Sequence, residues 1–169
     1  SPGYLDLNSG GVQTAGDEEP FVHVYEWSSG AWNQLGNALK HQDNPLQVDP
    51  FISFFGRSVS ISGDGRHIAV HSPAGMDSSS THGRTFIYSW DSSTNDWEQV
   101  GAAIKSEPGE SYRGVISQSS IKCAYAEVSL SGDGKHVAIG GFNFDGSGSS
   151  AGRVRVFETA WVDPPASPS

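Results

Sequence analysis

A ten-residue block that occurs twice limits the fold of this chain more than any other feature. Residues 61–70 read ISGDGRHIAV and residues 130–139 read LSGDGKHVAI, at an offset of 69 residues. Three more blocks recur in the same order along the sequence. They match Val22–Trp27 with Thr85–Trp90 and Val154–Glu158, Trp32–Gly36 with Trp97–Gly101, and Gly83-Arg84 with Gly152-Arg153. Such a repeat predicts a fold built from similar units that pack on one another.

Each block has the pattern of a strand or a turn. In Val59-Ser-Ile61 and its copy Val128-Ser-Leu130, apolar and small polar residues alternate, as they do on a half-buried strand. The Gly-Asp-Gly that follows each of them supplies residues that adopt positive φ, which a tight hairpin needs. Val22 and Val24 lie on one face of a further strand, with Tyr25 on the other face, and the copies keep this order.

These patterns predict nine strands in groups of two, four and three, with long connections at 41–53 and 106–123. We expect an all-β domain over residues 21–158, with two tandem four-stranded antiparallel, blade-like sheets related by a pseudo-twofold repeat. Residues 1–20 and 159–169 have the composition of an N-terminal arm and a C-terminal tail. The strand at 154–158 is left over, and no partner sheet is predicted for it within the chain.

Composition supports this fold class and excludes several classes of function. The 21 Gly and 9 Pro disfavour a helix bundle, while 5 Trp, 5 Tyr and 8 Phe supply too much apolar surface for a disordered chain. No apolar run approaches the ~20 residues of a membrane-spanning helix. A net charge of −9 without a Lys/Arg cluster offers no electrostatic route to nucleic acid or to an anionic membrane. We therefore expect protein partners, with no nucleic acid and no membrane insertion.

The repeated blocks resemble FG-GAP repeats, the blades of integrin-α-type β-propellers. The residues that carry the resemblance are Phe55-Gly56, Ser58-Val59-Ser60, Asp64-Gly65, Ile68-Ala69-Val70, Pro73, Gly83–Trp90 and Trp32–Gly36. The second copy departs from this pattern, with Ala124-Tyr125-Ala126 in place of Phe55-Gly56-Arg57 and Phe142 in place of Pro73. The resemblance covers residues 21–158 and implies blade-like sheets of a kind common in large exported proteins of microbes and algae.

Nine strands amount to two blades and one strand, whereas closed propellers have ~4–8 blades. Three arrangements are compatible with this number. The chain can be an incomplete propeller cut from a longer protein, a two-sheet sandwich, or a subunit that neighbouring subunits complete.

The candidate metal sites and catalytic sites in the sequence are poor. The resemblance implies calcium loops at 75–80 and 143–148, but each holds a single carboxylate, too few for a competent site. His67 and His136 occupy matching positions after the Gly-Asp-Gly turns, which favours a structural role. No nucleophile elbow or phosphate-binding loop is present, and Cys123 is expected to be a small buried side chain. We expect no metal, no cofactor and no enzymatic activity.

Aromatic residues outside the repeat are the better candidates for a specific contact. Trp27, Trp32, Trp90 and Trp97 occupy matched positions, which favours packing within the repeat, and the alternative is that some of them face an interface. A residue found in one copy only is not required by the repeat, and the leftover strand offers an edge to another chain. The candidate interface residues are therefore Tyr112, Tyr125, Phe142, Phe144, Val156 and Trp161.

The sequence favours a non-enzymatic structural or assembly protein that self-associates. Its blade-like repeats would be completed by other subunits in a lattice, in a sheath or shell, or as an auxiliary subunit of a large complex. The alternative is a recognition module of a larger extracellular propeller protein that binds protein or glycan. The chain starts at Ser1 and not at Met, so we expect either that a targeting segment has been removed or that the chain is a fragment. The sequence leaves the compartment unknown, and removal of a targeting segment would imply export or an organelle lumen or stroma.

Overall fold

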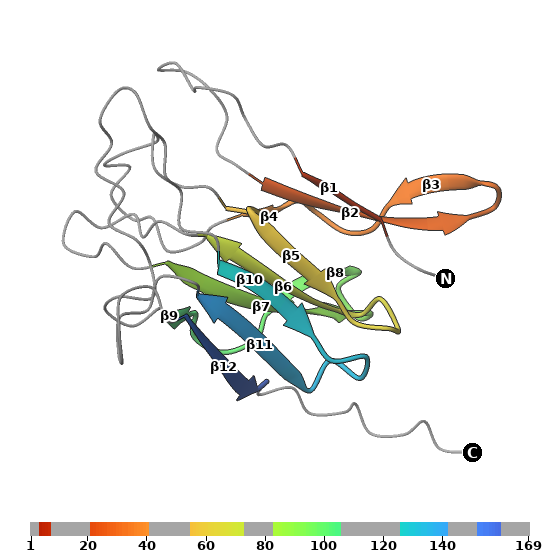
Figure 1. Ribbon diagram of the computed structural model, residues 1–169. Coiled ribbons are helices and arrows are strands. Elements are labelled where there is room, and N and C mark those ends of the chain that lie inside the picture. Colours follow the sequence, from red (N-terminus) through yellow and green to blue (C-terminus); the bar gives the residue numbers. More distant parts are fainter. Residues whose placement is uncertain are drawn as a thin grey trace, which may run out of the picture.

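The computed structural model describes the backbone of residues 4–7 and 126 and, in full, residues 21–40, 55–72, 83–105, 127–141 and 152–159. These residues form twelve β-strands and no helix, which confirms the predicted all-β class (Figure 1). Within this described part of the chain, no helix has the length and apolar character needed to cross a membrane.

The strands form three antiparallel sheets that follow one another along the chain. Sheet 1 contains β1 (Tyr4–Leu7), β2 (Phe21–Ser28), β3 (Ala31–Gln34) and β4 (Leu39–Lys40). Sheet 2 contains β5 (Ser58–Ile61), β6 (His67–Ser72), β7 (Arg84–Asp91), β8 (Asp96–Gln99) and β9 (Ile104–Lys105). Sheet 3 contains β10 (Ala126–Leu130), β11 (His136–Gly141) and β12 (Arg153–Glu158).

The number of sheets and strands differs from the prediction of two four-stranded sheets. The nine predicted strands are present as β2–β3, β5–β8 and β10–β12, and the three further strands are β1, β4 and β9. β1 lies in the predicted arm and pairs with β2, with Tyr4 opposite Tyr25. It takes the place beside β2 that β6 takes beside β7, where Ile68 lies opposite Tyr88. The first group of strands therefore forms a sheet of its own.

The prediction that the strand at 154–158 has no partner within the chain is wrong. β12 pairs with β11 from His136 opposite Glu158 to Gly141 opposite Arg153. The physical reason is that β10, β11 and β12 repeat the hairpin and return strand that β5, β6 and β7 form in sheet 2. β12 is therefore the edge strand of sheet 3 and is paired along one side with β11.

The three sheets lie face to face in a stack with sheet 2 in the middle (Figure 1). Side chains alternate along β6, so Ile68 and Val70 pack toward sheet 1 while Ala69 packs toward sheet 3. Core 1, between sheets 1 and 2, consists of Val22, Val24, Leu39, Phe55, Ile68, Val70, Phe86, Tyr88 and Trp97. Core 2, between sheets 2 and 3, consists of Ala69, Ile87, Val128, Leu130, Val137 and Ile139.

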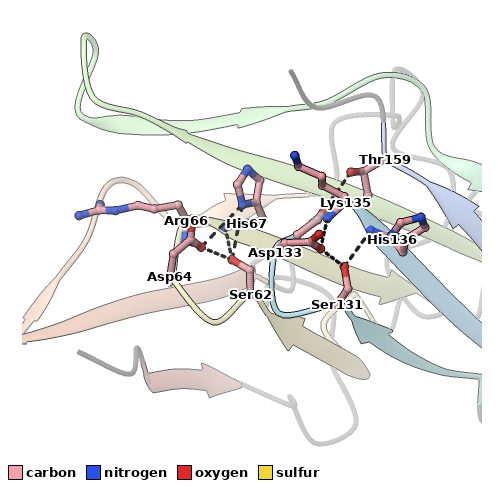
Figure 2. A network of polar contacts seen from close by, with 10 residues as sticks. Ser62, Asp64, Arg66, His67, Ser131, Asp133, Lys135, His136 and Thr159 are labelled. Atoms are coloured by element: carbon pink, nitrogen blue, oxygen red, sulfur yellow. Dashed lines mark hydrogen bonds and ion pairs between the residues drawn. The ribbon is translucent and has the colours of Figure 1, made fainter. Parts of the chain in front are cut away.

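The two Ser-Gly-Asp-Gly turns have the same local structure, as predicted (Figure 2). In the first turn, the Ser62 hydroxyl donates to the Asp64 carboxylate at 2.5 Å and accepts from the His67 amide at 2.9 Å. The same bonds, at 2.5 and 2.9 Å, recur among Ser131, Asp133 and His136. The glycine after each aspartate has a φ of 71° or 72°, a conformation that other residues adopt at a cost.

Candidate protein-interaction site

Matching positions on β2, β7 and β12 differ sharply in exposure. Val24 on β2 is 1% exposed and Ile87 on β7 is 5% exposed, whereas Val156 on β12 is 65% exposed. The positions two residues earlier follow the same order, with exposed fractions of 0%, 1% and 68% for Val22, Thr85 and Val154. Strand direction and residue type are similar in all three strands. The difference therefore lies in what covers them.

Each of the first two faces is covered by the sheet that follows it in the stack. Val22 and Val24 belong to core 1, which sheet 2 closes, and Ile87 belongs to core 2, which sheet 3 closes. Among the described residues, sheet 3 is the last sheet of the stack, and no further sheet packs on it. Its outer face consists of Ser129, Ala138, Gly140, Val154 and Val156, with Glu127, His136 and Glu158 around them.

Serines on β5 and β10 show the same difference between a covered and an uncovered sheet face. The amides of Val128 and Leu130 on β10 donate to the hydroxyl oxygens of Ser58 and Ser60 on β5, at 3.1 and 2.9 Å. These two bonds join sheet 3 to sheet 2 beside core 2. The residue on β10 that matches Ser60 is Ser129, which is exposed on the outer face of sheet 3. That face therefore keeps a hydroxyl at a position used elsewhere for a contact between sheets.

The two turns are also stacked, and only the first is covered. The Gly63 amide donates to the Gly132 carbonyl at 2.9 Å, which joins one turn to the other. A Cβ added at Gly134 would lie 2.6 Å from His67 Nδ1, so the second turn sits directly on this histidine. His67 is buried, whereas its counterpart His136 is exposed. The outer turn thus repeats the features of a turn that receives a neighbour.

A pair of tryptophans marks the opposite end of the stack. Trp27 and Trp32 on sheet 1 meet edge to face, with ring centroids 5.4 Å apart and an interplanar angle of 67°. Trp90 and Trp97 on sheet 2 form the same pair at 5.3 Å and 68°. Trp97 is 8% exposed, whereas Trp27 and Trp32 are 46% and 48% exposed. The same aromatic pair is covered in sheet 2 and half exposed in sheet 1.

A turn of sheet 1 covers the tryptophan pair of sheet 2. The Trp97 indole donates to the Leu35 carbonyl at 2.8 Å. A Cβ added at Gly36 would lie 2.9 Å from atoms of both indole rings, so only glycine fits here without a shift. The Asn37 amide and side chain both donate to the Asp96 carboxylate, at 2.8 and 2.6 Å. We call the contact between two neighbouring sheets a joint. The joint between sheets 1 and 2 shows how a neighbouring sheet packs on a tryptophan pair in this fold.

The pKa shifts of Asp64 and His71 have local structural causes. Partial burial raises the pKa of Asp64, but hydrogen bonds from the Ser62 hydroxyl and the Arg66 amide outweigh it, so the pKa lies below its usual value. Burial lowers the pKa of His71 to about 4. The Nδ1 of that ring lies 2.9 Å from the Thr85 hydroxyl. Among these residues, no group of three or more His, Cys, Asp and Glu side chains is placed to hold a metal ion.

Of the predicted interface residues, only Val156 lies within the described part of the chain, and it is exposed on the outer face of sheet 3. Cys123 and the loops at 75–80 and 143–148 lie outside the described residues. So do the remaining candidates, which are Tyr112, Tyr125, Phe142, Phe144 and Trp161.

Val154, Trp27 and Trp32 are exposed but are not among the predicted interface residues. For the tryptophans, the matched positions favoured packing within the repeat over the alternative of an interface. The usable signal was the order of the repeats, since among the described sheets the first and the last each have one neighbour fewer than the middle one.

Comparisons of the chain with protein-family models, curated proteins and solved structures gave no match.

Proposed function

We propose that this chain is a non-enzymatic structural or assembly protein, completed through contacts between its outer sheets and other protein subunits. The lattice, sheath or shell and the large complex considered above are the kinds of assembly in which such a subunit would serve. The self-associating form of this proposal is argued further below.

One observation carries the proposal, namely the exposure of Val154 and Val156 at positions whose counterparts are buried. Two β-branched side chains on the outer face of sheet 3, beside Ala138 and Gly140, make an apolar surface. Contiguous apolar surface on a soluble protein marks a site of interaction with another molecule. The net charge of −9 disfavours nucleic acid and anionic lipid as that molecule. A protein surface is the best match.

The alternative is a recognition module from a larger extracellular propeller protein. The order of the sheets favours it as a second candidate, because sheets 1 and 2 are each covered by the next sheet along the chain. Under this alternative, a further repeat of the same polypeptide would cover Val154 and Val156. Its loops would then bind protein or glycan.

Sedimentation velocity over a wide concentration series tests the proposal. The wild-type chain, of 17.9 kDa, is expected to form larger species as concentration rises. The double variant Val154→Ser/Val156→Ser is expected to stay monomeric, because it removes the apolar contact and leaves the strand pairing intact. Ser92→Asp, in the exposed turn between β7 and β8, is the control and should associate like the wild type.

A wild-type chain that stays monomeric throughout the series would overturn the assembly function. The alternative would then take its place. Association that is unchanged in the double variant would also contradict the proposal, because the outer face of sheet 3 would have no part in it.

A further inference from the structure

We infer that this chain pairs head to tail with a second copy of itself, the outer face of sheet 3 in one copy seating on the Trp27–Trp32 face of sheet 1 in the next. This inference rests on the proposed function, because it names the partner in the proposed assembly. The two faces are the two ends of the stack in Figure 1.

The joint between sheets 1 and 2 shows what each end is suited to receive. There, Val22 and Val24 of sheet 1 pack into core 1 against Phe86 and Tyr88 of sheet 2. Trp97 belongs to the same core, and Trp90 packs against it. A face of two β-branched residues thus meets a face of aromatic residues.

The chain repeats both halves of this joint at the two ends of the stack, where the valines and tryptophans are exposed and His23 and Tyr25 are half-buried. Val154 and Val156 match Val22 and Val24 in the repeat. On sheet 1, the residues that match Phe86, Tyr88, Trp90 and Trp97 are His23, Tyr25, Trp27 and Trp32. The aromatic character of that face is therefore kept.

The rings on the outer face of sheet 1 are already ordered into one surface. His23 stacks on Tyr25, with centroids 6.1 Å apart and planes at 27°, and the tryptophan pair adjoins them on β2 and β3. Rigid aromatic side chains lose little conformational freedom on binding, which is why Trp and Tyr dominate interface energies. This face is preorganised for a sheet that presents valines.

Exposure singles out the same residues. The large apolar side chains that are exposed in the described part of the chain are Trp27, Trp32, Val154 and Val156. Two lie at one end of the stack and two at the other. The sides of the stack contribute none of them.

A second copy is the occupant that these observations favour, because one chain carries both complementary halves. Contact between unlike faces is heterologous, so it closes into a ring or continues as an open filament. Two copies would supply six sheets, within the ~4–8 blades of closed propellers. Each copy carries a net charge of −9, so pairing is expected to strengthen as salt screens the repulsion.

The test combines two variants that block opposite ends. Val156→Asp places a charge on the outer face of sheet 3, and Trp32→Asp places one on the outer face of sheet 1. Each variant alone is expected to be monomeric in sedimentation velocity, since every head-to-tail contact would contain a blocked face. Mixed in equal amounts, they are expected to form a one-to-one dimer through the two intact faces.

Two further variants distinguish loss of pairing from loss of the fold. Trp27→Thr introduces a β-branched residue, which favours the strand, and tests the same face as Trp32→Asp. Trp32→Ala is expected to weaken pairing by about 30-fold or more, as for a hot-spot residue. Ser92→Asp is the charge control, and the far-ultraviolet circular dichroism of each variant should match that of the wild type.

The outcomes separate this inference from the proposed function. If the wild type associates and Val156→Asp abolishes association while the Trp27 and Trp32 variants associate normally, head-to-tail pairing is overturned and the assembly function stands. Failure of the mixed variants to form a dimer overturns head-to-tail pairing in the same way. A wild-type chain that is monomeric at every concentration and salt level overturns both. Restored dimer in the mixture supports the inference.

Discussion

Sheets 2 and 3 share a turn, a strand order and a register, yet sheet 2 is buried on both faces and sheet 3 on one. All six side chains of β6 are buried, whereas on β11 more buried and less buried side chains alternate. Ala69 and Ala138 are the same residue at matching positions, and only Ala69 is fully buried. Burial in this chain is therefore set by the number of neighbouring sheets as much as by the local sequence.

Ile87 and Val156 give the largest expected contrast between the two sheets. Ile87→Ala leaves a cavity in core 2 and should lower the free energy of unfolding by about 2–5 kcal/mol. Val156→Ala changes an exposed side chain and should lower it by about 0.5 kcal/mol or less. Urea unfolding at a concentration where the chain is monomeric measures both. Equal losses would mean that Val156 is buried within a single chain.

His71 on β6 and Gly140 on β11 also match, so only sheet 2 buries a histidine at this position. Its pKa is about 4 in the fold and 6.5 without burial, so the unfolded chain binds the extra proton more readily. The part of the unfolding free energy that depends on a neutral His71 is fully present above pH 6.5. It falls by about 3 kcal/mol as pH drops toward 4. His71→Gln should remove this part of the pH dependence.

Unfolding free energies measured from pH 7 to pH 4 check the prediction for His71. Val156→Ala is the control, because it changes an exposed side chain without an ionisable group and should keep the wild-type pH profile. A pH profile of His71→Gln that matches the wild type would contradict the prediction.

Gly36 and Gly101 form the same turn in sheets 1 and 2, one covering a tryptophan pair and the other facing open space. Their φ angles are 73° and 67°, so alanine strains both by about 1–2 kcal/mol. Only at Gly36 would the new Cβ collide with neighbours, 2.9 Å from both indoles. Gly36→Ala should therefore cost about 1–3 kcal/mol more than Gly101→Ala in urea unfolding. Similar losses of unfolding free energy in the two variants would show that the residues around Gly36 move apart at little cost.

Asp64 and Asp133 should show the smallest contrast, because their turns make the same bonds. The Ser131 hydroxyl and the Lys135 amide hold the pKa of Asp133 below its usual value, as the matching groups do for Asp64. Asp64→Asn and Asp133→Asn should each cause a small loss of stability at pH 7. Each loss should shrink as pH falls through the lowered pKa of the carboxyl. Thermal unfolding at pH 7 and pH 3 would detect a difference between the two turns.

The individual strands and hairpins could be predicted from the sequence, but the number of stacked sheets could not. The alternation around Ser60 and the Gly-Asp-Gly turns predicted the strands and hairpins where they occur. β1 was missed because YLDL at residues 4–7 shares no pattern with HIAVHS of β6, although the two strands occupy matching places. β4 and β9 pair over only two residues each, too few for a pattern to reveal.

Exposure at the ends of the stack could not be predicted from residue types. Val24 and Val156 are both valine, and Trp32 and Trp97 are both tryptophan, yet each pair has one buried and one exposed member. The type of a residue does not indicate whether a neighbouring sheet covers it. Knowledge of the sheet order was needed to identify Val154, Trp27 and Trp32 as candidate interface residues.

The position of sheet 2 between its two neighbours gives this fold the thermodynamics of a one-dimensional chain. The total stability is then close to a sum of terms for each sheet and for each of the two joints. A lesion in core 2 weakens the joint that holds sheet 3, while the aromatic joint on the far side of sheet 2 keeps its contacts. We therefore expect loss of structure to begin at either end of the stack and to spread inward, with β6 and β7 the last strands to open.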